Sequence, residues 1–519
     1  MGKTVRIPLV GVPHSRLFSD ATAEPAISAL DQRFINIIFK AELNPVTGQR
    51  RIRACKRPGL DTGTTVSNVS GSVLGACSAV DTFGSVYGFS VWASSTANNI
   101  RVQLGTSQSD NASTTSTAQR ASRPALLNVD GTPQFYFHVH SASSGIQAFV
   151  ATAADPPVIS AQTDGDLPET TLIGGFAALD GYLFIATIDG AIYNSDLNND
   201  TSWTSTSFIE SSIQQFGRGV FSYKDKIGLF TTETIEFYEN VGNATGSPLQ
   251  RVDQLTQRGY GIAGNTDSAI ETSRWYLSAL DTVFWINSSR AGQGGVFMLD
   301  GFRPKKISTP DVDFWIGQVS ISSLRIAGTF QMWGMNYLAI HCVDSSTDYL
   351  QVYCFELGTW ATWESPLLAN NDAIFIVNDE QATGETLALA YIANKYHYFD
   401  TSTILFSGIS YTDEGSAYTA TIRTRNLDFD TRKKKRINRL TLIGNDPQET
   451  STCTLSASSD DFANFTAFTA RSMNLTDFDG APTTTRLGAH RKLAFRITNS
   501  TNAAMELEAI ELDMDELSV

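Results

Sequence analysis

The sequence predicts an all-β protein: a six- or seven-bladed β-propeller followed by a C-terminal β-sandwich-like domain. Short runs of alternating apolar and polar residues recur along most of the chain, which is the period of a strand with one buried face. Aromatic residues make up 10% of the chain and glycines number 39, a composition that suits many strands joined by tight turns. The best helical candidate, Ala26–Ala41, has a second half rich in strand-forming residues, so no long amphipathic helix is expected.

The clearest strand pattern lies between Gln215 and Thr309. In this stretch an apolar strand, a short polar turn, an aromatic-rich strand and another turn follow one another. Seven imperfect copies of this unit begin near Val73, Gln134, Gly181, Asp225, Arg274, Met332 and Ala373. The copies start roughly 40 to 60 residues apart, the spacing of four-stranded propeller blades. The chain has no strict WD or kelch signature, so the pattern leaves both six and seven blades open.

Changes in composition divide the chain into three parts. A chain of 519 residues predicts two or more domains. Residues 71–401 hold the repeats and are predicted to form the propeller. Residues 1–70 and 402–519 lie outside the repeats; we expect the first to be an N-terminal extension and the second a β-sandwich, together forming a platform between subunits.

Charge and cysteine content narrow the class of protein. The formal net charge of −15 argues against a sequence-specific DNA-binding protein with a basic footprint, although a duplex that slides past an acidic wall is compatible with it. No run of about 18 apolar residues is present, so we expect no membrane span. The five cysteines are odd in number and scattered, which favours buried thiols in a reducing compartment rather than a disulfide scaffold.

Two short patterns imitate ligand sites. His138 and His140 share one face of a predicted strand, but no third metal ligand is apparent, so a structural role is favoured. Asp196, Asn198 and Asp200 resemble the start of a calcium loop, yet Thr201 replaces the required glycine, so a turn is favoured.

No motif for catalysis stands out. The sequence shows neither a nucleophile elbow nor a histidine-based triad, and we predict no enzymatic activity, no metal and no cofactor. Paired glycosidase carboxylates stay open as an alternative, because any two of the 53 acidic residues can meet in the fold.

Two basic runs lie outside the repeats and are the candidate sites for contact with another subunit or partner. A solvated strand edge and a solvated hairpin tip are the plainer interpretations of these runs. The candidate contact residues are Arg50, Arg51, Arg53, Lys56, Arg57, Arg432, Lys433, Lys434, Lys435, Arg436 and Arg439.

The central strands resemble a known family. The segment IGLFTTETIEFYENVGNATGSPLQRV (Ile227–Val252), followed by RGYGIAGNTDSAIETSRWYLSALD (Arg258–Asp281), resembles the packaged-DNA stabilisation proteins of short-tailed bacteriophages, also called tail hub or nozzle proteins. The N-terminal INIIFKAELNPVTGQRRIRACKRPGL and the C-terminal RKLAFRITNSTNAAMELEAIELDMDE are similar to the opening and closing parts of that family. These motifs are structural, so no site residues carry over from the family.

The resemblance implies a role in the virion tail. A member of this family would form a homo-hexameric ring below the portal and its adaptor, the head-to-tail connector, and would carry tail spikes or fibres outside. Double-stranded DNA would be retained and then ejected through the lumen without sequence specificity. A glycan-binding or glycan-cleaving propeller of the tail, and a propeller scaffold that binds protein loops, remain the alternatives.

The basic runs bear on how such a conduit would handle DNA. Basic contacts to phosphates would hold the genome back, so we expect a lumen of acidic and small polar residues, with both basic runs facing protein neighbours. The alternative is that the run Arg432–Arg436 grips the duplex.

Overall fold

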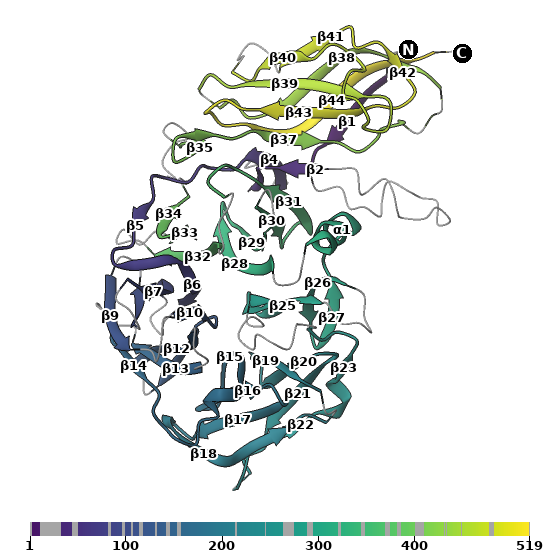
Figure 1. Cartoon of the computed structure of the whole chain (residues 1–519). Coiled ribbons are helices and arrows are strands. Elements are labelled where there is room, and N and C mark those ends of the chain that lie inside the picture. The colour runs from purple at the N-terminus through teal and green to yellow at the C-terminus, as the bar shows by residue number, and fades with distance from the viewer. Residues whose placement is uncertain are drawn as a thin grey trace.

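The computed structural model describes most of the chain in detail. The described residues are 3–10, 33–43, 50–80, 85–95, 99–104, 107–113, 118–129, 132–141, 146–152, 157–212, 215–243, 245–262, 274–287, 294–319, 323–343, 348–368, 374–380, 386–399, 409–429, 431, 433–447, 449–476 and 482–517. Within them the chain forms a propeller and, beside it, two further sheets that we call the platform (Figure 1).

The propeller consists of successive antiparallel sheets, which we number as blades 1 to 7. Blade 1 contains β6 (Val69–Val80), β7 (Val86–Ser94), β8 (Asn99–Leu104) and β9 (Ser107–Ser113). Blade 2 contains β10 (Ala118–Ala121), β11 (Ala125–Val129), β12 (Thr132–Ser141), β13 (Ile146–Thr152) and β14 (Ile159–Ala161). Blade 3 contains β15 (Leu172–Leu179), β16 (Tyr182–Thr187), β17 (Ala191–Asp196) and β18 (Asn199–Glu210).

The remaining blades repeat the arrangement. Blade 4 contains β19 (Gly217–Tyr223), β20 (Lys226–Thr231), β21 (Thr234–Asn240), β22 (Leu249–Arg251) and β23 (Gln257–Arg258). Blade 5 contains β24 (Tyr276–Ala279), β25 (Thr282–Asn287), β26 (Gly295–Asp300) and β27 (Arg303–Lys306). Blade 6 contains β28 (Leu324–Met332), β29 (Met335–Cys342), β30 (Tyr349–Cys354) and β31 (Thr359–Trp363). Blade 7 contains β32 (Ile374–Glu380), β33 (Thr386–Ile392), β34 (Lys395–Tyr398) and β5 (Thr64–Thr65).

This arrangement confirms the predicted propeller of six or seven blades. Six of the sheets are separate, and blade 6 is part of a nine-stranded sheet that runs on into the platform. The predicted copies fall one in each sheet. The ring is closed by an early segment of the chain, because Thr64 and Thr65 of β5 pair with Tyr396 and Lys395 of β34.

The innermost strands of all the blades surround the propeller axis. A cavity of about 300 Å³ lies there, lined by residues from every blade. The hydroxyl of Tyr276 accepts a hydrogen bond from Gly175 N (2.9 Å) and donates to the carbonyl of Val220 (3.1 Å), so one side chain ties blades 3, 4 and 5 together. Arg123 donates to the carbonyl of Ile326 in blade 6 (2.5 Å).

The platform consists of two sheets built from both ends of the chain. The first sheet contains β1 (Lys3–Pro8), β3 (Ile37–Leu43), β4 (Arg50–Lys56), β38 (Lys435–Gly444), β41 (Thr483–Thr485), β42 (Ala489–His490) and β44 (Glu506–Glu516). The second sheet contains β2 (Arg33–Ile35), β37 (Ala420–Arg423), β39 (Thr452–Ser458), β40 (Arg471–Asn474) and β43 (Ala494–Asn499), and it continues from β31 of blade 6. The hairpin of β35 (Thr412–Asp413) and β36 (Ser416–Ala417) forms a small sheet of its own.

The platform and the propeller share one hydrophobic core. Phe330 and Ile376 of the blades lie in the same buried cluster as Ile422, Leu440 and Ile510 of the platform sheets. The indole of Trp363 in β31 donates to the carbonyl of Ile37 in β3 (2.8 Å). Removal of residues 402–519 would therefore expose a core that blade 6 needs. The division of the chain into domains at residues 70 and 401 stays a prediction.

Short elements complete the fold. Two 3₁₀ turns, η1 (Glu169–Thr171) and η2 (Asp253–Leu255), lie in loops. Within the described residues the single α-helix is α1 (Pro310–Gln318), whose first turn is capped by the Thr309 hydroxyl accepting from Val312 N. The part of Ala26–Ala41 that is described contains strands and no helix.

The close approach of blades 6 and 7 predicts that a glycine between them cannot be replaced without loss of stability. A Cβ atom on Gly328 would lie 1.9 Å from the carbonyl oxygen of Ile376, which belongs to the backbone of β32 and cannot rotate away. We expect Gly328→Ala to lower the free energy of unfolding by about 1–3 kcal/mol, as overpacking does elsewhere, measured by urea denaturation.

Gly165→Ala is the matched control, because a Cβ atom at Gly165 would meet nothing within 4 Å. Equal denaturation midpoints for the two variants would contradict the close approach of blades 6 and 7.

Candidate functional site: the Arg57 junction and the platform arginines and lysines

The structure separates the predicted contact residues into buried and exposed groups. Arg53, Lys56, Arg57 and Lys435 are buried. Arg51, Lys433, Lys434, Arg436 and Arg439 are exposed. Arg50 begins β4, and Arg432 lies outside the described residues. That these eleven residues contact another chain stays a prediction. The buried ones already have partners within this chain.

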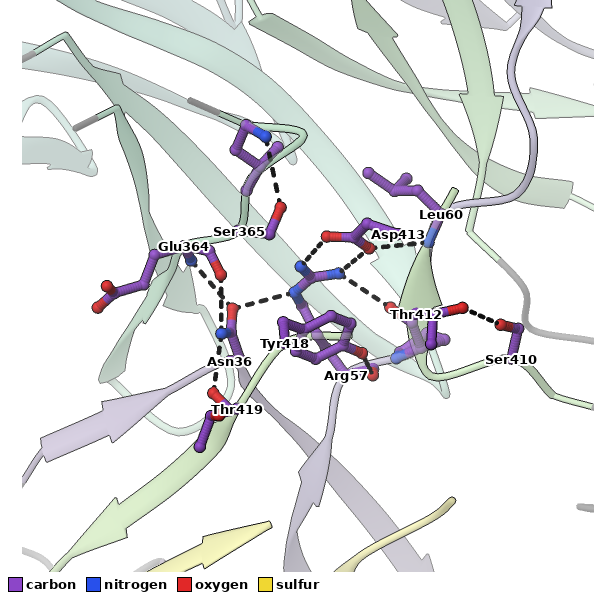
Figure 2. A network of polar contacts seen from close by, with 12 residues as sticks. Asn36, Arg57, Leu60, Glu364, Ser365, Ser410, Thr412, Asp413, Tyr418 and Thr419 are labelled. Atoms are coloured by element: carbon purple, nitrogen blue, oxygen red, sulfur yellow. Dashed lines mark hydrogen bonds and ion pairs between the residues drawn. The ribbon is translucent and has the colours of Figure 1, made fainter. Parts of the chain in front are cut away.

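Arg57 is the centre of a polar network at the junction of propeller and platform (Figure 2). Its guanidinium binds the Asp413 carboxylate with both terminal nitrogens, Nη1 to Oδ1 at 2.9 Å and Nη2 to Oδ2 at 2.6 Å. The same carboxylate accepts a hydrogen bond from Leu60 N at 3.0 Å. Both side chains are fully buried, so the pair is held without water. A bidentate geometry of this kind is the strongest arrangement of an arginine and a carboxylate.

Asn36 extends this network to blade 6. Arg57 Nε donates to Asn36 Oδ1 (3.2 Å), which also accepts from Glu364 N (2.9 Å). The Asn36 amide donates in turn to the carbonyls of Glu364 (2.8 Å) and Thr419 (3.0 Å). Asn36 has a φ of +54°, a backbone conformation that asparagine tolerates better than most residues. It separates β2 from β3, and so directs the chain from one platform sheet to the other.

Aromatic rings enclose the buried charge of Arg57. Its guanidinium lies 4.0 Å from the Tyr418 ring centre and 5.6 Å from that of Trp363. The Tyr418 hydroxyl donates to the carbonyl of Arg57. Burial opposes the charge of Arg57, but the carboxylate of Asp413 outweighs it and raises the pKa of the guanidinium. Burial likewise opposes the charge of Asp413, and Arg57 still holds the pKa of Asp413 below its usual value.

The two basic neighbours of Arg57 also point into the platform. Lys56 Nζ donates to Thr501 O (2.6 Å) and Asn499 Oδ1 (3.3 Å). Burial, assisted by the nearby charge of Arg57, lowers the pKa of Lys56 to about 8. Arg53 Nη1 binds the carboxylates of Glu42 (2.5 Å) and Glu506 (3.4 Å). These residues hold β4 to its neighbours.

The second basic run has a buried member and an exposed face. Lys435 Nζ donates to the carbonyls of Asp428, Thr431 and Arg491 and so closes a loop. Arg439 pairs with Asp513 at 2.7 Å, and Lys433 lies 3.8 Å from Glu516. Exposed pairs of this kind contribute little to stability, so these side chains are available to a partner.

The residues whose spacing resembles that of metal sites lie in a buried strand and in a tight turn. His138 is buried in β12, and burial lowers its pKa to about 3. Asp196 and Asn199 pair across the tight turn between β17 and β18, which confirms the expected turn. In the described part of the chain no group of three or more His, Cys, Asp or Glu side chains is placed to hold a metal ion. All five cysteines are buried and free.

Sequence reasoning missed Asn36 and Asp413. Arg57 and Asp413 are 356 residues apart in the chain, so no local spacing connects them. The only local sign was the position of Arg57 before Pro58 and Gly59, where a chain commonly turns.

With the fold described, known proteins can be compared with it. Residues 126–364, somewhat less than half of the chain, match the family model described as Bacteriophage P22 Gp10, beta-propeller. The resemblance to the phage nozzle proteins is confirmed. The matched segment begins in blade 2 and ends just after β31 of blade 6. A search of curated proteins returned no match.

Solved structures that resemble the chain are distant. A chain of the Mitotic Checkpoint Complex has a TM-score of 0.39 and 9% identity, with 66% of this chain and 96% of that chain covered. Sqt1 from Saccharomyces cerevisiae has a TM-score of 0.39 and 6% identity, with 67% and 100% covered. An exo-β-1,3-galactanase from Phanerochaete chrysosporium has a TM-score of 0.27 and 12% identity, with 88% and 98% covered.

None of the helices in the described residues has the length and apolar character needed to cross a bilayer.

The Arg57–Asp413 pair predicts a large effect of removing one partner. Asp413→Ala leaves a buried guanidinium without its counter-charge, and we expect the free energy of unfolding to fall by about 3–5 kcal/mol in chemical denaturation. The double variant Arg57→Met, Asp413→Leu removes both charges and should lose less than the single variant.

Asp253→Ala is the control, because Arg251 and Asp253 also approach to 2.6 Å but lie at the surface. Its expected loss is below about 1 kcal/mol. Similar losses for Asp413→Ala and Asp253→Ala would contradict the structural role of the buried pair.

The lowered pKa of Lys56 predicts a gain of stability in mild alkali. Between pH 8 and the ordinary lysine pKa of 10.5, the unfolded chain binds a proton at Lys56 that the folded chain has released. The free energy of unfolding therefore rises with pH in this window. We expect a gain of roughly 2 kcal/mol from pH 8 to 10 relative to Lys56→Met, from paired denaturation curves at each pH. Parallel pH dependences of the two proteins would contradict this.

Proposed function

We propose that the chain is the repeating subunit of a phage tail nozzle. It would form a hexameric ring below the portal and adaptor, carry spikes or fibres, retain the packaged genome and provide the conduit for its ejection. The observation that carries this proposal is the match of residues 126–364 to the P22 Gp10 propeller family. The role is structural and needs neither catalysis nor a cofactor.

The small size of the cavity on the propeller axis supports a conduit between subunits rather than within one. A cavity of about 300 Å³, crossed by Tyr276 and Arg123, is the size of a small-molecule pocket and cannot admit a duplex. A DNA path must therefore be enclosed by several copies around a common axis, as a closed ring provides.

The net charge suits a conduit through which DNA slides. Six copies, each with a formal charge of −15, would carry −90 together. Basic contacts to DNA gain free energy from counterion release, so a generally basic wall would hold the duplex. In our proposal the lumen is mainly acidic and polar, and retention depends on a constriction or on a few arginine contacts.

The exposed basic residues of β38 and the segment before it are proposed to join one subunit to the next. Lys433, Lys434 and Arg436 are exposed, whereas Lys435 is used inside the fold. A ring interface is heterologous, so this patch would meet a different, acidic surface of the neighbour.

Charge reversal tests this assignment. We expect Lys433→Glu, Lys434→Glu, Arg436→Glu to abolish rings that the wild-type chain forms, because the new carboxylates would face an acidic neighbour. Native mass spectrometry and electron microscopy of both proteins measure this. In phage assembled with the variant, tail or adaptor attachment should fail while filled heads otherwise keep their DNA.

The control carries the same change of charge elsewhere: Lys224→Glu, Arg303→Glu, Lys305→Glu, all exposed on blades 4 and 5. It should assemble normally. Normal assembly of the platform variant with leakage of DNA from filled heads would contradict the interface. A wild-type chain that stays monomeric and releases sugar from a panel of host glycans would instead support the glycan-cleaving alternative.

A further inference from the structure

Three arginines form a row across neighbouring strands of the platform. Arg33 of β2 lies directly opposite Arg423 of β37, and Arg423 lies directly opposite Arg496 of β43. The next strand, β39, places Ser456 opposite Arg496. Adjacent strands are about 4.8 Å apart, so the three side chains leave one face of the sheet as near neighbours. We call them the arginine row.

The arginine row lies on the outer face of the nine-stranded sheet. In each strand the residue next to the arginine, Phe34, Ile422 or Ile497, is buried in the shared core, so the half-buried Arg33, Arg423 and Arg496 point the other way. The strands β37, β43 and β39 lie side by side in the upper part of Figure 1. Thr421, Thr498, Thr454 and Ser472 form a row of hydroxyl side chains parallel to the arginine row on this face, and Ile35 of β2 separates this row from Thr362.

Each arginine of the row lies over an aromatic ring. Arg33 is 5.3 Å from the Trp315 ring centre, Arg423 is 4.6 Å from that of Phe462, and Arg496 is 4.1 Å from that of Phe465. Arg496 Nε also donates to the Ser456 hydroxyl (3.3 Å). Stacking fixes the plane of a guanidinium, so less freedom is lost when it binds a planar or tetrahedral anion.

Two carboxylates of the loop beside the row have partners of their own. Asp460 accepts from Ser458 and Asn464, and Asp461 binds Lys492 and Asn426. Like charges directly opposite each other on adjacent strands are destabilising. The row concentrates three positive charges in a chain whose net charge is −15, and a polyanion would be attracted to it.

We infer that the arginine row binds the phosphate backbone of duplex DNA. The row supplies guanidinium groups and the parallel row supplies hydroxyls, which are the side-chain donors that proteins use on phosphates. The choice of DNA as the polyanion rests on the proposed function. Three phosphate contacts per subunit give weak, sequence-independent binding that salt weakens, and repetition around a ring multiplies it.

The test measures binding of the full-length chain to a fluorescent 20-base-pair duplex by anisotropy at several salt concentrations. Each phosphate contact contributes about 0.9 to the slope of log affinity against log salt. We expect Arg423→Gln, Arg496→Gln to reduce that slope by about 1.8 and affinity at low salt by about tenfold. Arg423→Lys, Arg496→Lys keeps the charge but loses the stacked plane, and should bind between the two.

Arg303→Gln, Lys305→Gln is the matched control, because both side chains are exposed and lie on β27 of blade 5, outside the platform and outside the proposed subunit interface. It should bind DNA as the wild type does. Equal binding by the row variant and the wild type, equal loss in the control, or absence of wild-type binding at low salt would each overturn the inference.

Native mass spectrometry on the same samples keeps this inference separate from the proposed function. If the chain forms rings whose DNA binding is unchanged in the row variant, the proposed function stands and the inference is wrong. If the chain never forms rings but its DNA binding depends on the arginine row, the inference stands and the proposed function is wrong.

Discussion

The buried pair of Arg57 and Asp413 is the constraint on which the rest of the structure depends. Neither charge can be placed in a dry interior alone, so the segments that carry them must meet whenever the chain is folded. Through Asn36 and Tyr418 the same network fixes the end of blade 6 and two platform strands. Propeller and platform therefore have one relative position and one core, as the proposed ring assembly would require.

The nine-stranded sheet also fixes the position of the platform relative to the propeller, because it belongs to both. The outermost strand of an ordinary blade is an edge, but β31 of blade 6 continues into β2 and then across the platform. One sheet thus extends from the propeller to the far side of the platform. The strands that carry the arginine row are therefore joined by backbone hydrogen bonds to blade 6.

Much of the fold was predictable from sequence, because a propeller blade is a local unit. The alternating aromatic runs located all the blades, and the turn at Asp196 was expected from its polar residues. The platform was harder, because its strands pair across nearly the whole chain. Arg53, Lys56 and Arg57 appeared as a solvated basic strip, since the partners Glu506, Asn499 and Asp413 that bury them are hundreds of residues away. The arginine row was missed for the same reason, because register between distant strands leaves no trace in local spacing.

Pairing of the two chain ends also sets an order of events during synthesis. Thr64 and Thr65 leave the ribosome long before β34, and β1 leaves long before β44, the strand with which it pairs. Contacts across such separations form slowly, because most of the loop entropy must be lost before they form. The blades can form one after another, but the last blade and the platform are completed only when the whole chain has been released. Incomplete chains therefore lack the platform surface on which the proposed ring would depend.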